Sequence, residues 1–138
     1  MEVKEVMTKE TSVINALDAI AKGAKKMQEK DIGWLPVMSG EEVVGAVTDR
    51  DIVVRGVAEG LDVATTPIKD VSSLGPVWCY SGDSLQDAAE SMKEKKVRRL
   101  LVVDNTKQPV GVVSIGDLAT EAENDELLAN TLEEVSSD

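Results

Sequence analysis

The chain has 138 residues, of which 42% are hydrophobic and only 2% aromatic, and its formal net charge is −11. This acidity argues against a nucleic-acid partner, because general nucleic-acid binding depends on Lys and Arg that neutralise phosphates. The chain contains no histidine and one cysteine, Cys79, which excludes an internal disulfide, a Ser–His–Asp triad and a His-built metal site.

Along the first 60 residues, the spacing of the apolar residues changes from one segment to the next and predicts a series of strands and helices. A short extended piece, 12–14, precedes a helix whose apolar residues are spaced by three and four positions (Leu17, Ile20, Ala21, Ala24 and Met27). Two strands are predicted at 34–38 and 43–47, joined by a polar turn of hairpin length. Thr48 then begins a second helix, so the pattern predicts a β-α-β-β-α unit.

The second half of the chain repeats this order. At an offset of 65, Val3–Val6 aligns with Ile68–Val71, and one extra residue in a later turn shifts the offset to 66. The corresponding elements are an extended piece at 77–79, a helix over Leu85, Ala88, Ala89 and Met92, and strands at 100–103 and 110–114. We therefore predict an α/β fold with repeats at 1–62 and 63–122. Because a three-stranded sheet with both helices on one face is thin, the repeats should pack together as a pseudo-twofold pair.

One motif occurs in both repeats, as Gly45–Asp51 and Gly111–Asp117. Each copy has a glycine, two apolar residues, a hydroxyl, two spacers and an aspartate. A hydroxyl three residues before an acid often only caps a helix. A helix N-terminus also favours a phosphate, however, and a carboxylate one turn later can accept hydrogen bonds from a ribose diol. Two copies in corresponding places favour the binding site over the cap alone.

The tail at 123–138 is acidic, and no Lys or Arg follows Lys107. Leu128, Leu132 and Val135 continue a helical apolar stripe through it. Two interpretations stay open: an extension of the last helix with a solvated acidic face, or a helix that contacts a second copy or docks a partner.

The motifs together resemble the CBS-domain family (cystathionine β-synthase domains), in the tandem arrangement called a Bateman module. The resemblance covers about residues 1–122. It rests on Val3–Thr8, Asp31–Val37, Gly45–Ile52 and the second copies of these segments. The stand-alone pair with its short acidic tail also looks like small stress-associated proteins of the hypoxic-response type.

The resemblance implies an adenosine-containing ligand, such as AMP, ADP, ATP or S-adenosylmethionine, and sensing rather than catalysis. By position, Asp51 and Asp117 would hold ribose hydroxyls, and Thr48 and Ser114 would meet the phosphate or ribose. The adenine slot would be lined by residues before each first helix and on the strand that follows it (Ser12, Val13, Trp78, Cys79, Trp34, Pro36 and the segment 99–101). Candidates for the phosphate are Arg50, Arg98 and Arg99.

The two copies differ, which predicts two non-equivalent clefts between the repeats. Arg50 is replaced by Gly116, and Gly33-Trp34 by Arg98-Arg99. Because neighbouring strand residues face opposite ways, only one of the two arginines should point at a cleft. Trp34 is open to either packing or adenine stacking.

We therefore expect a sensor that requires no cofactor or metal, with no catalytic residue. The lack of a signal-length or membrane-spanning apolar run predicts a cytoplasmic protein without a membrane partner. A homodimer is expected because the second helices carry more apolar residues than one sheet face can cover (Ile52, Val53, Val54 and Val57, with Leu118, Ala119 and Ala122).

One alternative is an interaction module with empty clefts and an acidic partner-docking helix. Another is a small enzyme in which Asp49, Asp51 and Asp117 hold Mg²⁺.

Overall fold

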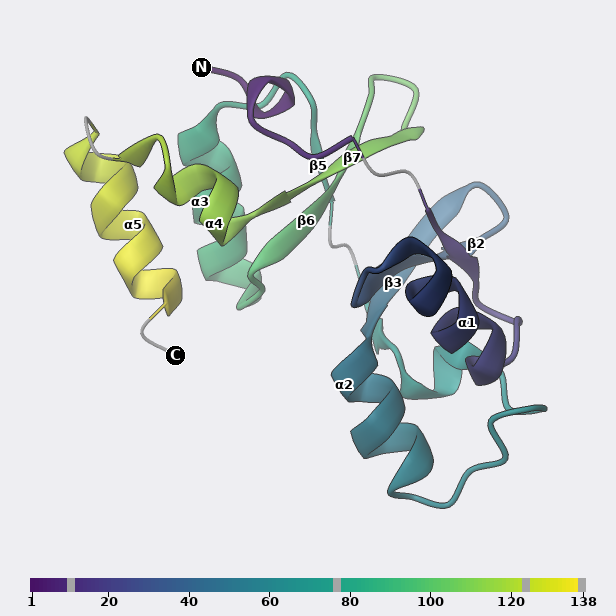
Figure 1. The fold of residues 1–138 in the computed structure, drawn as a ribbon. Helices are drawn as coiled ribbons and strands as arrows, with labels where there is room; N and C mark the ends of the chain where they lie inside the picture. The colour runs from purple at the N-terminus through teal and green to yellow at the C-terminus, as the bar shows by residue number, and fades with distance from the viewer. Residues whose placement is uncertain (10–11, 76–77, 123–124, 137–138) are drawn as a thin grey trace. The chain divides into compact units, whose positions relative to one another are not determined.

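The computed structural model describes residues 1–9, 12–75, 78–122 and 125–136, and its elements form a mixed α/β fold with two sheets (Figure 1). The chain divides into two compact units, which we call the middle unit (12–76) and the terminal unit (1–11 with 77–138). The α/β class predicted from the sequence is confirmed. Among the described residues, no helix has the length and apolar character that crossing a membrane requires.

The middle unit has a four-stranded sheet in the order β1-β2-β3-β4, formed by Ile14–Asn15, Trp34–Ser39, Glu42–Thr48 and Ser73–Leu74. Its helices are α1 (Ile20–Lys30), α2 (Asp49–Asp51), the π-helical η2 (Ile52–Val57) and the 3₁₀ turn η3 (Ile68–Val71). Alternate strand residues such as Leu35, Val37 and Val47 are fully buried against Ile20 and Ile68. The strands lie within two residues of their predicted places. The predicted apolar stripe of the first helix is wrong in part: α1 buries Ile20 and Met27, but Leu17 lies before it and is 72% exposed, and Ala21 and Ala24 are exposed as well. The second helix continues from α2 in the wider π geometry.

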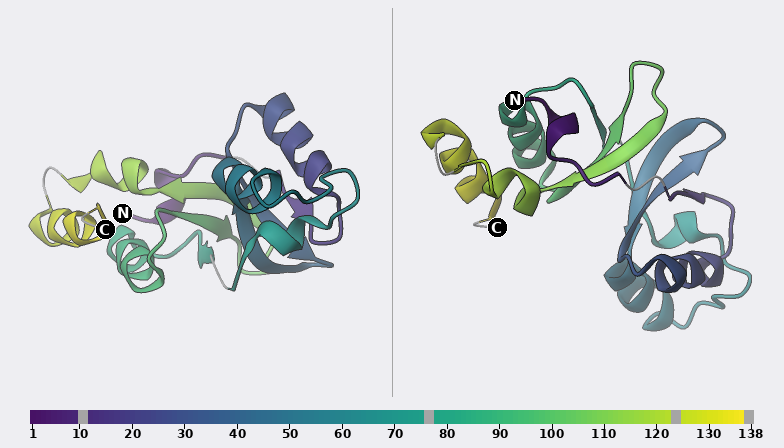
Figure 2. Two further views of the ribbon diagram at one scale, coloured as in Figure 1. Left: turned by 90° about the horizontal axis from the view of Figure 1, so that it is seen from below. Right: turned by 45° about the horizontal axis from the view of Figure 1, so that its top comes forward.

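The terminal unit has a three-stranded sheet in the order β5-β6-β7, formed by Trp78–Tyr80, Arg99–Val103 and Pro109–Ser114. Its helices are the 3₁₀ turn η1 (Val3–Glu5), α3 (Leu85–Lys95), α4 (Ile115–Ala119) and α5 (Glu126–Ser136). In both views of Figure 2, α5 lies beside α3. Its Leu128, Leu132 and Val135 are buried in the core of the unit. The apolar stripe of the tail is therefore used inside this unit, by a helix separate from α4.

Each unit is completed by a segment that belongs, by sequence, to the other repeat. In the terminal unit, the arm formed by residues 1–9 lies along β7, where Thr8 N donates to the Val112 carbonyl at 2.9 Å (Figure 1). Val3 of this arm is fully buried in the core. In the middle unit, Ile68 is fully buried in the core, and β4 pairs with β3. The spatial units therefore do not follow the repeat boundaries.

The two exchanged segments make corresponding backbone hydrogen bonds. Val3 N donates to Asp83 O and Lys4 N to Ser81 O in the terminal unit, while Ile68 N donates to Asp18 O and Lys69 N to Ala16 O in the middle unit. These distances lie between 2.7 and 3.1 Å. The acceptors in the two units are also 65 residues apart. The exchange of segments is therefore the same structural feature in both repeats.

The glycine of the repeated motif is explained by these segments. A Cβ on Gly45 would lie 2.3 Å from the Ser73 carbonyl oxygen, and one on Gly111 would lie 2.6 Å from the Thr8 carbonyl oxygen. Both neighbours are backbone atoms that hold the exchanged segments. A glycine allows a ligand or another backbone to approach closely, and at both positions the structure shows the approach of a backbone.

Replacing Gly45 by alanine is therefore expected to lower the free energy of unfolding by about 1–3 kcal/mol, the usual cost of overpacking. Urea denaturation followed by circular dichroism measures this change. Gly82 is the matched control, since a Cβ there meets nothing within 4 Å. Gly82→Ala should change the stability by about 0.5 kcal/mol or less. Equal effects of the two variants would show that β4 does not lie against Gly45.

Candidate ligand-binding site

The hydroxyl and the aspartate of the first motif are joined by reciprocal hydrogen bonds at the start of α2. Thr48 N donates to Asp51 Oδ2 at 2.9 Å, and Asp51 N donates to Thr48 Oγ1 at 3.0 Å. The β2–β3 register pairs Thr48 with Trp34, so their side chains share a face of the sheet. This is a complete capping box.

The second motif repeats this geometry at the start of α4. Ser114 N donates to Asp117 Oδ2 at 2.8 Å, and Asp117 N donates to Ser114 Oγ at 3.2 Å. Here the strand partner of Ser114 is Arg99. A guanidinium therefore stands at the position that the indole of Trp34 has in the first copy, next to the hydroxyl.

The capping role leaves each aspartate with a second carboxylate oxygen, and these oxygens differ. Asp51 Oδ1 lies 3.9 Å from Arg55 Nε, a loose ion pair within the same helix. Asp117 Oδ1 has no hydrogen bond or ion pair to any residue that the structure describes. At the position corresponding to Arg55 the second repeat has Glu121. The cap and a ribose contact are therefore compatible in geometry, and the two copies offer non-equivalent carboxylates.

Cys79 and Trp78 lie on opposite faces of β5. Cys79 is 5% exposed and belongs to the core with Leu100 and Val102. Burial, together with the nearby carboxylate of Asp83, raises the pKa of the Cys79 thiol to about 12, although Lys95 opposes this shift. The thiol is therefore neutral and packed in the core, and Cys79 can meet a ligand only through its backbone. Trp78 is half-buried on the face that Leu101 and Arg99 share.

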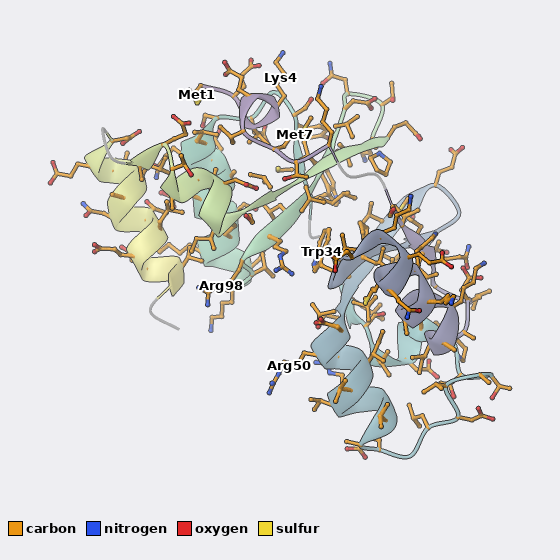
Figure 3. The ribbon with its side chains drawn as sticks, viewed as in Figure 1. Met1, Lys4, Met7, Trp34, Arg50 and Arg98 are labelled. Atoms are coloured by element: carbon orange, nitrogen blue, oxygen red, sulfur yellow. The ribbon has the colours of Figure 1, made fainter. Side chains whose placement is uncertain are left out.

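The three arginines that are candidates for the phosphate, Arg50, Arg98 and Arg99, are exposed. Arg99 lies in the ladder opposite Ser114, whereas Arg98 precedes β6, and its carbonyl accepts a hydrogen bond from Ile115 N at 2.9 Å. Figure 3 shows Arg50 extending from α2 and Arg98 just before the start of β6. Strand register thus puts Arg99, rather than Arg98, on the face of Trp78 and Ser114.

The first repeat has smaller side chains before its first helix, where Ser12 and Val13 correspond to Val77 and Trp78 in sequence. Ser12 and Val13 precede β1 and are half-buried, while Pro36 is buried in β2 beside the half-buried Trp34. The Lys26 ammonium, from α1, donates to the Val13 carbonyl at 2.5 Å. This contact could not be predicted from the sequence. Lys26 lies 13 positions after Val13, and no local pattern indicates that a helical lysine bonds to that carbonyl.

The described residues contain no group of three or more His, Cys, Asp or Glu side chains that could hold a metal ion. Asp49, one of the candidates for Mg²⁺, points its carboxylate back to its own helix start, where Oδ1 accepts from Arg50 N at 2.9 Å. Its Oδ2 lies 2.8 Å from the place that a Cβ on Gly33 would take.

Comparison with known proteins identifies two matches to the same family model, the CBS domain, at residues 3–56 and 68–124. The CBS domain-containing protein YhcV of Bacillus subtilis is 34% identical over 134 residues, which cover 97% of this chain and 94% of that protein.

Two solved structures have the same fold. One is the crystal structure of Hypoxic Response Protein I with two coordinated zinc ions, which is 29% identical and has a TM-score of 0.75. The match covers 87% of this chain and 98% of that protein's chain. The CBS domain protein PAE2072 of Pyrobaculum aerophilum, complexed with AMP, is 24% identical, has a TM-score of 0.74, and covers 96% of this chain and 99% of its own.

Proposed function

The chain belongs to the CBS domain family, and from this premise we propose that it is a cytosolic sensor that binds an adenine nucleotide or a related adenosyl compound and catalyses no reaction. AMP, ADP or ATP is the expected ligand, with S-adenosylmethionine as the other adenosyl candidate. PAE2072, a protein of the same fold, binds AMP, which supports the class of ligand.

The observation that carries this proposal is the duplicated capping box, in which the second carboxylate oxygen of Asp117 has no partner among the described residues and that of Asp51 has only a loose ion pair with Arg55 at 3.9 Å. A box needed only for the helix uses one oxygen of the aspartate and the hydroxyl of its partner. The remaining oxygen of Asp117 is next to Ser114, whose strand neighbour Arg99 brings a guanidinium to the same end of the sheet. A carboxylate for a diol and an arginine for a phosphate are the groups that a nucleotide needs.

The test is the affinity of the whole chain for AMP compared with adenosine, by isothermal titration calorimetry, together with the melting temperature. Ligand at 100 times Kd should stabilise the chain by about 2.7 kcal/mol. We expect AMP to bind more tightly than adenosine and to weaken as salt increases, because exposed charge-assisted contacts are screened. Equal affinities for AMP and adenosine would show that the chain has no phosphate site and would favour S-adenosylmethionine as the ligand.

Two rival functions give different results in the same experiment. An interaction module with empty clefts predicts that no nucleotide changes the melting temperature. An enzyme predicts turnover of ATP above a blank. The zinc ions of Hypoxic Response Protein I belong to that protein, and this chain, with no histidine and its one cysteine in the core, has few of the residues that zinc prefers.

A homodimer is part of the proposal, and it is supported by an apolar surface on η2. Val53, Val54 and Val57 are 57%, 45% and 61% exposed, whereas Ile52 of the same element is buried. Three exposed valines on six residues are an apolar patch of the kind that marks association sites. Twofold pairing is the commonest way in which such a patch is covered.

Sedimentation velocity at micromolar concentration should therefore show a dimer for the wild type and a monomer for Val54→Asp. The control is Leu127→Asp on α5, which replaces another exposed apolar side chain, 63% exposed, with the same charge. That variant should stay dimeric. A wild type that sediments only as a monomer would contradict the dimer without affecting the ligand proposal.

A further inference from the structure

Two aromatic side chains lie together on β5, in a chain that has only two Trp, one Tyr and no Phe. The ring centroids of Trp78 and Tyr80 are 5.1 Å apart, with an interplanar angle of 82°, an edge-to-face arrangement. Both side chains are half-buried, on the face opposite the buried Cys79. Most of the aromatic surface of the protein is thus gathered at one place that stays partly open to solvent.

A cation covers this pair. The Lys107 ammonium lies 5.6 Å from the centroid of the Trp78 ring, within the range of a cation–π contact. The side chain of Lys107 is exposed and forms no ion pair with the described residues. Its charge is therefore available to a ligand that reaches the ring.

The β6–β7 turn is built to hold Lys107 there. The Asp104 carboxylate accepts hydrogen bonds from Thr106 N at 2.8 Å, Thr106 Oγ1 at 2.6 Å and Gln108 N at 3.0 Å. These bonds, that of the Thr106 hydroxyl first, hold the pKa of Asp104 below its usual range. Lys107 itself has φ 62°, a conformation that favours glycine or asparagine. The turn therefore fixes the backbone of Lys107 at the end of the hairpin, from which its side chain reaches Trp78.

The first repeat lacks every part of this arrangement. Val13 and Asn15 stand at the positions of Trp78 and Tyr80, and the corresponding turn ends in Glu41 and Glu42. The residue with positive φ in that turn is Gly40, at 62°. The fold therefore forms without the aromatic pair and without the cation, so these residues are not a requirement of the hairpin.

We propose that Lys107 is a ligand-binding residue of the second repeat: its ammonium leaves the face of the Trp78 ring when a purine base stacks there, and it then donates a hydrogen bond to an acceptor nitrogen at the edge of that base. Tyr80 is a positioning residue that holds the indole ring by its edge-to-face contact. This inference rests on the proposed adenosyl ligand and assigns its base to the terminal unit.

The geometry of the sheet supports the base rather than the phosphate at Lys107. Arg99 and Ser114 are paired at one end of β6, Trp78 is paired with Leu101 two residues further on, and Lys107 lies beyond Val103 at the hairpin turn. A ligand with its ribose and phosphate at Ser114 therefore presents its base to Trp78 and Lys107. An ammonium has three donors and no acceptor, which suits ring nitrogens such as those of adenine.

Calorimetric titration of Lys107→Gln, Lys107→Arg and the wild type with AMP and with adenosine tests this assignment. Lys107→Gln should bind both ligands roughly tenfold more weakly, the loss of one charge-assisted hydrogen bond. Lys107→Arg, which keeps the charge, should lose less. The matched control is Lys25→Gln in α1, an exposed lysine whose substitution changes the net charge equally and should leave both affinities unchanged.

Tyr80 and Trp78 supply independent measurements. Tyr80→Phe keeps the ring contact and should keep the affinity for AMP, whereas Tyr80→Ala removes it and should lower the affinity. A merely structural role would lower the melting temperature of Tyr80→Ala without changing its affinity for AMP. The change in tryptophan fluorescence on addition of AMP should be smaller in Trp78→Phe than in the wild type, and Trp34→Phe is the matched control that should keep the signal of Trp78.

Each other outcome overturns part of the assignment. If the wild type binds AMP and Lys107→Gln binds it equally well, Lys107 is not a ligand residue, and the proposed function stands. A loss confined to AMP places Lys107 at the phosphate and overturns the base contact. If AMP, adenosine and ATP give neither heat nor a shift in melting temperature with the wild type, both proposals fail.

Discussion

Replacing Leu128 by alanine should lower the free energy of unfolding by about 2–5 kcal/mol, the range measured for buried leucines. Leu128 is 2% exposed and lies in the core of the terminal unit with Leu132 and Val135. The helix that carries it is also tied to α3 by the Lys93–Glu134 ion pair at 2.5 Å and by Gln86 Nε2, which donates to Thr131 Oγ1 at 2.9 Å. Urea denaturation of the whole chain measures the loss.

Leu127 is the matched control, because it is the preceding residue on the same helix and is 63% exposed. Leu127→Ala should change the stability by about 0.5 kcal/mol or less. If Leu128→Ala is as mild as Leu127→Ala, then α5 is not docked in solution, and its apolar stripe is free for a partner. That result would favour the interaction module over the sensor.

Replacing either motif aspartate by asparagine should weaken AMP binding about tenfold to a hundredfold, if these carboxylates hold the ribose. An asparagine keeps the size and one acceptor oxygen, so the bond from the Thr48 or Ser114 amide can be retained. The cost in folding stability should then be below about 1 kcal/mol. Calorimetry with AMP and a melting curve, measured on Asp51→Asn and Asp117→Asn, separate binding from capping.

The chain contains a suitable control at α3. Asp87 N donates to the Ser84 hydroxyl at 3.0 Å, the same spacing of hydroxyl and acid at a helix start, but outside the repeated motif. Asp87→Asn should leave the affinity for AMP unchanged. Unchanged affinity in all three variants would reduce the repeated motif to a helix cap in both copies.

The two motif variants also report whether the sites are equivalent. Arg50 beside Asp51 favours the first site, because the second copy has Gly116 there. The structure adds a competing contact, since Asp51 Oδ1 already lies 3.9 Å from Arg55, whereas Asp117 has no such neighbour among the described residues. A loss of binding in one variant alone would identify the working site.

The sequence by itself determined the features that depend on neighbours along the chain. The duplication, the order of strands and helices, and both capping boxes follow from hydrophobic period and from groups three residues apart, such as Thr48 and Asp51. These are set by local hydrogen bonds and by the alternation of buried side chains, which a single segment encodes. The same motifs carried the resemblance to the CBS domain.

Only the tertiary structure decided which segments meet across long separations. The repeats look independent in sequence, yet Val3 completes the terminal unit and Ile68 the middle one. Apolar burial does not depend on sequence separation, so a short apolar segment can fill either of two similar grooves. The return of α5 onto α3 is likewise a consequence of packing.

In the candidate site, too, the sequence predicted some features and the tertiary structure decided the others. The residue types at Asp51, Asp117, Thr48 and Ser114 could be predicted from their spacing. Strand register, however, decided that Cys79 faces the core while Trp78 and Arg99 share the other face. Lys107 was out of reach of any local rule, because its ammonium lies over a ring 29 positions earlier in the chain. That contact exists because the Asp104 turn and the parallel pairing of β5 with β6 bring the two residues together.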